Sequence, residues 1–163
     1  MHLRTATDDD WTAIFPIYAA VMAQGRTYAF PAGQDLAQAR PWWMEPPPGR
    51  TVVALDDDGA VLGSAKMGPN RPGRGAHVAT ASFLVDPAGQ GAGVGRALGE
   101  HVIGWCSEQG YRAIQFNAVV ETNARAVSLW RSLGFAVIGT VPEAFDHPEH
   151  GYVGLHVMHR ALL

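Results

Sequence analysis

The sequence predicts a mixed α/β fold, and three features of the chain support this. Residues 51–55 and 60–65 are apolar runs typical of strands, and the Asp-Asp-Asp-Gly segment 56–59 between them favours a hairpin turn. Apolar residues recur at helical spacing from Val94 to Trp105. A glycine-rich run at 89–95 joins a strand-like segment directly to that helix. We therefore expect strands and helices to share one mixed architecture.

The other elements follow from similar signals in chain order. Residues 3–6 resemble a short strand, and the acidic residues 8–10 precede a helix because its N-terminus favours negative charge. Apolar spacing indicates that this helix runs from Trp11 to Met22. The remaining elements are a loop at 25–33, helices near 34–43, from Val94 to the stop at Gly110 and at 123–133, and strands at 77–85, 113–120, 135–141 and 152–159.

Length and composition predict one domain over residues 1–163. The chain has 163 residues and 47% hydrophobic content, which is enough for one domain with a substantial core. Two domains of this total length would each be small. A net charge of −3 gives no general attraction to nucleic acid, so we expect no nucleic-acid partner. No apolar stretch can span a bilayer and residues 1–4 lack a signal-peptide core, so we expect no membrane association and a cytoplasmic protein.

Cysteine and histidine indicate neither a disulfide framework nor a metal site. Cys106 is the one cysteine and lies in a helical apolar pattern, so we interpret it as a buried hydrophobic residue. The seven histidines lack zinc-ligand spacing. Asp146, His147, Glu149 and His150 are suitable ligand types, but we interpret them as a solvated hairpin loop that rims a site. We therefore expect no metal.

The glycine run is suited to binding phosphate. Without Cβ atoms, Gly91, Gly93 and Gly95 allow a ligand to approach the backbone, and the following helix N-terminus adds partial positive charge near Arg96. The order of the glycines does not match the Rossmann fingerprint, and no Gly-Lys-Ser/Thr sequence closes a P-loop. A flexible connector is the alternative, but the helix begins inside the run.

The sequence Gln-Gly-Ala-Gly-Val-Gly at 90–95 matches the pattern Q/R-x-x-G-x-G/A, and here the chain resembles the GNAT superfamily of N-acetyltransferases. Residues 83–87 resemble the bulged fourth strand of that family, and residues 123–135 resemble its second motif. The resemblance implies a GNAT acyl-CoA N-acyltransferase fold, with a mixed, mostly antiparallel sheet, splayed fourth and fifth strands and flanking helices. It also implies acetyl-CoA as cosubstrate, direct acetyl transfer to an amine, and a possible homodimer.

The resemblance also implies where acetyl-CoA binds. Its pyrophosphate would lie on the N–H groups of residues 91–96, and its pantetheine arm would pair with main-chain groups of Phe83 and Val85 between the splayed strands. Asn123 would contact the arm, although an Asn before a helix is often only an N-cap. The implied cofactor-binding residues are Phe83, Leu84, Val85, Gln90, Gly91, Ala92, Gly93, Val94, Gly95, Arg96, Asn123 and Trp130.

A narrower resemblance concerns the acceptor. The loop 70–77, the Phe-Asn pair at 116–117 and the Thr-Asn pair at 122–123 are similar to fungal N-acetyltransferases that act on proline analogues such as azetidine-2-carboxylate. This resemblance implies that Asn117 and Thr80 face the acceptor, which would be an amino acid or an analogue of one. Tyr28 and Phe30, on the loop after the first helix, are expected either to wall the acceptor pocket or to pack as core aromatics.

The chemistry needs an oxyanion donor and a proton acceptor. We expect the Val85 N–H, or one beside it, to stabilise the oxyanion. Glu121 and His77 are both candidate bases, although Glu121 is equally interpretable as a solvated helix start and His77 as a structural residue, and a water chain can replace both. Trp130 stands where many GNAT enzymes have a Tyr that protonates the thiolate, and an indole N–H donates hydrogen bonds without acting as an acid.

Three functions are compatible with these features. The first is acetylation of a small-molecule amine, and the second is acetylation of a protein N-terminus, a lysine or a polyamine. The third is a non-catalytic acetyl-CoA sensor, which only the departure at Trp130 favours.

Overall fold

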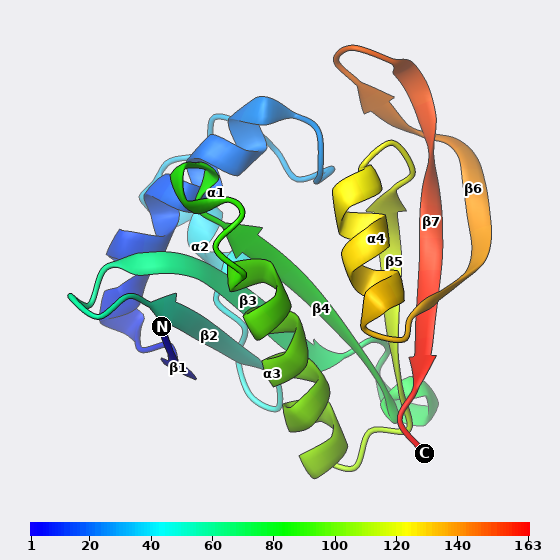
Figure 1. Ribbon diagram of the computed structural model, residues 1–163, viewed down its shortest axis with the longest axis horizontal. Coiled ribbons are helices and arrows are strands. Elements are labelled where there is room, and N and C mark those ends of the chain that lie inside the picture. Colours follow the sequence, from blue (N-terminus) through cyan, green and yellow to red (C-terminus); the bar gives the residue numbers. More distant parts are fainter.

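The computed structural model describes residues 1–163 and contains one seven-stranded sheet with four helices (Figure 1). The strand order is β1-β2-β3-β4-β5-β7-β6, and every neighbouring pair is antiparallel except β4–β5. The strands are β1 (His2–Thr5), β2 (Arg50–Leu55), β3 (Val61–Pro69), β4 (Val78–Val85), β5 (Ala113–Val120), β6 (Ala136–His147) and β7 (Gly151–Ala161). The helices are α1 (Trp11–Gln24), α2 (Leu36–Trp43), α3 (Val94–Glu108) and α4 (Ala124–Ser132). This architecture confirms the expected mixed, mostly antiparallel sheet flanked by helices.

Strands β4 and β5 separate soon after they meet. They pair in parallel only at Val78–Ala113 and Ala79–Ile114, and Figure 1 shows them diverging beyond this point. Further along β5, its pairing with β7 shifts register between Phe116 and Val119. The expected splay is therefore present, and it opens the middle of the sheet where a ligand can reach main-chain groups.

Two apolar cores cover the two faces of the sheet. Helices α1 and α2 pack on one face against Val53 and Leu84, and α3 packs on the other against residues such as Val52 and Ala65. Side chains alternate between the faces of a strand, so the neighbours Val52 and Val53 enter different cores. No helix combines the length and the apolar character needed to cross a membrane.

Two strands are longer than the sequence indicates. β3 continues to Pro69 rather than ending at residue 65, which places Lys66 within the sheet. β6 continues to His147 rather than ending at residue 141, because it stays paired with β7 past an irregularity between Val141 and Phe145. The expectation of a solvated loop over residues 146–150 therefore fails at His147, which is only 6% exposed.

Candidate active site

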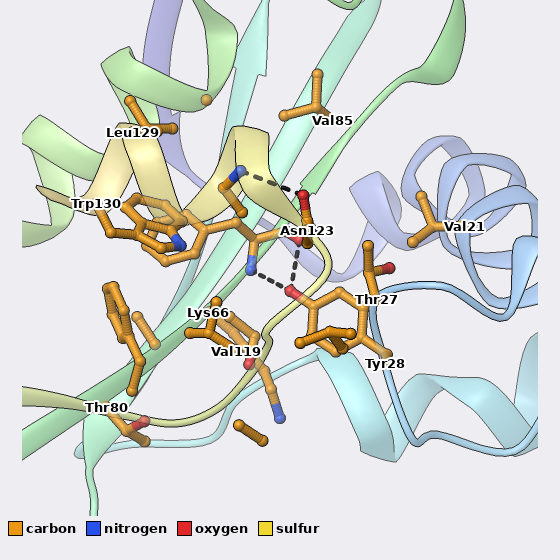
Figure 2. A pocket seen from close by; sticks show the side chains of 18 of the residues that line it. Val21, Thr27, Tyr28, Lys66, Thr80, Val85, Val119, Asn123, Leu129 and Trp130 are labelled. Carbon is orange, nitrogen blue, oxygen red and sulfur yellow. Dashed lines mark hydrogen bonds between the residues drawn. The ribbon is translucent and has the colours of Figure 1, made fainter. Parts of the chain in front are cut away.

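A cavity of about 790 Å³ lies at the splay of β4 and β5. Its lining comes from α1 and the loop after it, from β3, β4 and β5, from the glycine run, and from α4. Figure 2 shows Tyr28 and Trp130 entering it from different elements. The glycine run lines one part of the cavity, and Phe30, Glu45 and Lys66 line another; we name these parts the donor end and the acceptor end after the roles that we propose for them.

The donor end presents unpaired backbone N–H groups. Gly91 and Gly93 adopt positive φ values of 95° and 79°, and Gly93 is the N-cap of α3. No acceptor within the chain binds the N–H groups of Gly91, Gly93, Val94, Gly95 and Arg96. These groups and the N-terminus of α3 form a cradle for an anion.

Two arginines flank this cradle. Arg125, on α4, donates from Nη1 to Oε1 of Gln90 at 3.1 Å. Arg96 donates from Nη2 to Oγ of Ser132 at 2.6 Å, which ties the start of α3 to the end of α4. Both arginines line the cavity, so the donor end carries positive charge in addition to free N–H groups.

The middle of the cavity is bordered by the β4 main chain. Asp86 N donates to Leu62 O and Asn70 N donates to Val78 O, so alternate residues of β4 bond to β3. The N–H and C=O groups of Phe83 and Val85 therefore point toward the splay. At Phe83 both groups are already bonded: the Tyr28 hydroxyl donates to Phe83 O at 2.6 Å and accepts from Phe83 N at 2.7 Å.

This contact corrects one expectation from the sequence. The Phe83 main-chain groups are not free for a ligand, because the Tyr28 side chain spans the splay and satisfies both. Burial raises the pKa of the Tyr28 phenol well above its usual value, so the group remains protonated and acts as a hydrogen-bond donor. Tyr28 belongs to the loop that was expected to wall the pocket, and Phe30 stacks against it with ring centroids 5.2 Å apart.

Aromatic rings surround the splay opposite Tyr28. Trp130 is 7% exposed, and its ring centroid lies 4.5 Å from that of Phe83 and 5.0 Å from that of Phe116. Its side chain lines the cavity beside these two rings. An indole N–H can donate a hydrogen bond but does not release a proton.

The two candidate Asn residues are held by defined contacts. Asn117 donates from Nδ2 to Oδ1 of Asn70 at 2.6 Å and accepts from Gln115 at 2.9 Å. Asn123 caps α4 by accepting from Ala126 N at 3.2 Å, and it also lines the cavity. Asn117 and Thr80 line the cavity as well.

Four of the residues expected at the site do not line the cavity. His77 is exposed before β4, and its carbonyl accepts from Arg112 N. The Glu121 carboxylate turns to β7, where it accepts from Gly154 N at 2.6 Å. Leu84 is buried between β4 and α1–α2, and the exposed Ala92 side chain is not part of the lining. Neither expected base therefore reaches the cavity.

Two charged residues at the acceptor end were missed from the sequence. Glu45 follows α2 in a proline-rich loop, and Lys66 lies on β3. Lys66 Nζ lies 3.6 Å from Glu45 Oε2 and 5.6 Å from the Phe30 ring centroid. The signal for Lys66 is that it is the only lysine of the chain and follows an apolar strand pattern. No local pattern marks Glu45.

The β6–β7 turn brings together potential metal ligands, of which His147 already has a hydrogen bond within the chain. Ligand atoms of His147, Glu149 and His150 lie within 4.8 Å of one another. However, His147 Nδ1 accepts from Glu149 N at 3.1 Å, which places the ring proton on Nε2 and leaves no free lone pair. Glu149 also pairs with Arg26, so this turn contacts the loop that carries Tyr28.

Comparisons with known proteins agree with this geometry. N-acetyltransferase aca1 of Schizosaccharomyces pombe is 31% identical over 113 residues, which are 69% of this chain and 54% of that protein. Protein SPT10 of Saccharomyces cerevisiae is 35% identical over 97 residues, covering 56% of this chain and 15% of that protein. The matched region thus spans about half or less of these relatives.

Solved structures resemble the whole chain. A GCN5-related N-acetyltransferase from Kribbella flavida is 61% identical with a TM-score of 0.95, covering 98% of this chain and 96% of that one. A phosphinothricin acetyltransferase from Sinorhizobium meliloti in complex with AcCoA is 25% identical with a TM-score of 0.87, covering 98% and 87%. The yncA protein of Salmonella typhimurium with acetyl-CoA is 26% identical with a TM-score of 0.83, covering 100% and 94%.

The sequence pattern of the acetyltransferase (GNAT) family matches residues 9–135, which include the glycine run, the splayed strands and α4. The match covers more than half of the chain and agrees with its strand order and its anion cradle. This chain belongs to the acetyltransferase (GNAT) family.

Proposed function

We propose that the protein transfers the acetyl group of acetyl-CoA directly to the amine of a small molecule. The observation that carries this proposal is one continuous cavity, with unpaired N–H groups at one end and an isolated charged pair at the other. The cradle at residues 91–96 suits a pyrophosphate, and the splay suits an extended arm. Two GNAT neighbours were solved with acetyl-CoA bound, which supports the choice of cosubstrate.

Direct transfer fits the side chains of the cavity. Cys106 is fully buried in α3, and burial raises the pKa of its thiol to about 12. No histidine lines the cavity, so the hydroxyls of Thr27, Thr80 and Ser82 have no imidazole partner to activate them. An amine that attacks the thioester itself needs no such nucleophile.

The β4 main chain supports transition-state stabilisation. The Val85 N–H points toward the splay, where it can donate to the oxyanion that forms on the acetyl group. Trp130 can donate to the departing sulphur, and a thiol of ordinary pKa about 8.5 leaves tolerably without a general acid. These roles for Val85 and Trp130 are part of the proposal.

An amino acid or a proline analogue is the first acceptor class that we propose. The Asn70–Asn117 contact joins the two segments that resemble the fungal azetidine-2-carboxylate acetyltransferases, and Asn117 can orient the acceptor through its amide. The name of the relative N-acetyltransferase aca1 supports transfer to a nitrogen and does not specify the acceptor. Peptides, lysine side chains and polyamines are the alternative acceptors.

Release of free CoA thiol from acetyl-CoA, measured with a thiol reagent, tests the proposal. The panel holds proline analogues, free amino acids, polyamines and short peptides. The single cysteine is inaccessible, so the protein itself contributes little background. Release with a small amine is the expected result. Release only with peptides or polyamines would replace the acceptor class, and tight acetyl-CoA binding without release on any amine would indicate a sensor.

A further inference from the structure

The charged residues of the cavity separate into two groups. The lining contains four of them: Glu45, Lys66, Arg96 and Arg125. The two arginines flank the glycine run, as their contacts with Ser132 and Gln90 show. Glu45 and Lys66 are therefore the charges available to an acceptor, and Glu45 is the only carboxylate in the lining.

Neither charged head group is satisfied within the chain. The 3.6 Å between Lys66 Nζ and Glu45 Oε2 exceeds a hydrogen bond, and neither head group has another polar partner. The side chains are only 21% and 35% exposed, so both have lost part of their hydration. A partly desolvated pair with poor geometry contributes little to stability, and both groups retain bonding capacity for a ligand.

The backbone around Glu45 leaves room for its side chain. A Cβ at Gly49 would lie 2.4 Å from Glu45 Cγ, so any larger residue there would displace the carboxylate. Glu45 N donates to Oγ1 of the buried Thr51 at 2.9 Å, which anchors the residue at the edge of β2. The position of Glu45 is thus defined by packing and hydrogen bonding.

Lys66 is placed with similar precision. It lies in β3 between Thr51 of β2 and Ser82 of β4, and its ammonium lies above the Phe30 ring. Figure 2 shows the side chain among those that line the cavity. A strand position is rigid, so the backbone of Lys66 is held at a fixed place beside the splay, from which its flexible side chain carries the charge toward Glu45.

We propose that Glu45 and Lys66 together recognise an acceptor that carries both an ammonium and a carboxylate, as an amino acid does. Lys66 binds the carboxylate, and Glu45 binds the ammonium and removes its proton. The empty site holds the two opposite charges side by side, and a zwitterion supplies a complementary charge to each. This assignment rests on the proposed acetyl transfer and names the acceptor class and the base for it.

The step balances as follows. The acceptor ammonium gives one proton to the Glu45 carboxylate, which frees the nitrogen lone pair. That lone pair forms the new C–N bond to the acetyl carbon, and the carbonyl electron pair moves to the oxygen, where the Val85 N–H can donate to it. When the C=O bond forms again, the C–S bond breaks and its electron pair remains on sulphur. The second amine proton neutralises the thiolate, and Glu45 later returns its proton to water.

Lys66→Met tests the carboxylate contact, because methionine keeps an unbranched apolar chain over Phe30. Acceptors are compared in pairs, each amino acid with its carboxamide, using common L-amino acids and azetidine-2-carboxylate. We expect kcat/KM for the acids to fall about 10- to 100-fold through KM, with the carboxamides unaffected. The matched control Arg131→Met removes a positive charge from exposed α4 surface. An equal loss for acids and carboxamides, or a wild type without preference for the acid, would overturn the assignment.

Glu45→Gln tests the proton transfer. The substitution preserves size and some hydrogen bonding, so we expect kcat to fall about 100-fold or more on every acceptor. Acetyl-CoA affinity should stay unchanged, which shows that the variant is folded. Glu108→Gln, at the exposed end of α3, is the matched control. Retention of more than half of the wild-type kcat in Glu45→Gln would refute the role as base.

A binding experiment separates this inference from the proposed function. Protein saturated with CoA is titrated calorimetrically with the same acid and carboxamide pairs, so that no transfer is needed. Preferential binding of an acid that Lys66→Met abolishes would support the site even if the wild type released no thiol, and the transfer alone would then be rejected. Turnover on amines without any preference for acids in binding would reject the site and keep the transferase.

Discussion

The donor and acceptor ends of the cavity are built in different ways. The donor end is one contiguous segment, residues 90–96, in which most of the backbone N–H groups have no acceptor within the chain. The acceptor end combines side chains from the loop after α1, the loop after α2, β3 and β5. Contiguous backbone sites leave a local pattern in the sequence, whereas assembled side-chain sites depend on tertiary structure.

The same difference determines how each end responds to substitution. At the donor end the conformation matters most, because positive φ at Gly91 and Gly93 directs the N–H groups into the cradle. At the acceptor end the identity of the charged head groups matters most, and the backbone serves to position them. Substitutions at one end should therefore leave the properties of the other end intact.

Gly93→Val should have the largest effect. Valine is strained at the φ of +79°, which costs about 1–3 kcal/mol of stability, and its methyl groups occupy the approach to the cradle. Loss of two or more charge-assisted hydrogen bonds should weaken acetyl-CoA binding about 100-fold or more. Calorimetric titration of the variant with acetyl-CoA measures the loss.

Gly104→Val is the control for this substitution. Gly104 lies in the middle of α3, where an added Cβ would meet no atom of another element within 4 Å, and its φ is ordinary. We expect unchanged acetyl-CoA affinity in this control. Unchanged affinity in Gly93→Val as well would show that the phosphates bind elsewhere.

Much of the fold could be predicted because its signals are local. The hairpin turn at 56–59, the glycine run and the helix stop at Gly110 each depend on a few neighbouring residues. The ends of the strands were harder to predict from the sequence. For example, β3 continues to Pro69 because it stays paired with its neighbours β2 and β4. That pairing is a tertiary effect, and it kept Lys66 outside the predicted strand.

The candidate base could not be predicted for a related reason. Glu121 directly follows β5, so the sequence predicts that it lies beside the cleft. In the structure its carboxylate lies at β7 instead, because it accepts a hydrogen bond from Gly154 N. Glu45 is remote from every motif and reaches the cavity through tertiary contacts, which include the Trp43–Ser64 hydrogen bond between α2 and β3 and the bond from Glu45 N to Thr51. Contacts of this kind join segments that are distant in the sequence, so residue spacing along one strand does not predict them.

Gly49→Ala should have an intermediate effect, confined to the acceptor end. The new Cβ would lie 2.4 Å from Glu45 Cγ and 2.9 Å from Met67 O, so the Glu45 side chain or its loop must shift. We expect kcat/KM for the acceptor to fall about tenfold, and stability to fall about 1–3 kcal/mol from overpacking. Steady-state kinetics and thermal unfolding measure the two effects, and acetyl-CoA affinity should not change.

A double-mutant cycle shows whether Gly49 acts through Glu45. If it only positions the carboxylate, Gly49→Ala should cause no further loss of kcat/KM in a Glu45→Ala background. Gly139→Ala, in β6 with open space around the site, serves as the control. Additive losses in the cycle would show that Gly49 affects the acceptor end by another route.

Tyr28→Phe should have the smallest effect, with opposite signs on stability and on cosubstrate binding. The hydroxyl bridges Phe83 N and Phe83 O in the empty protein, so its removal costs about 1 kcal/mol of folding stability. The same removal frees both Phe83 groups for the amides of the pantetheine arm, which no longer has to displace the phenol. Acetyl-CoA should therefore bind about fivefold more tightly to a less stable protein.

Thermal unfolding and calorimetric titration of Tyr28→Phe measure these two changes on one preparation. Tyr152→Phe, on the exposed surface of β7, should change neither quantity. Weaker acetyl-CoA binding in Tyr28→Phe would mean that the phenol holds β4 in its binding conformation rather than competing with the arm. Because Tyr28 stacks on Phe30 while its hydroxyl bonds to β4, this single substitution tests whether the two ends of the cavity are independent or are coupled through the loop that joins them.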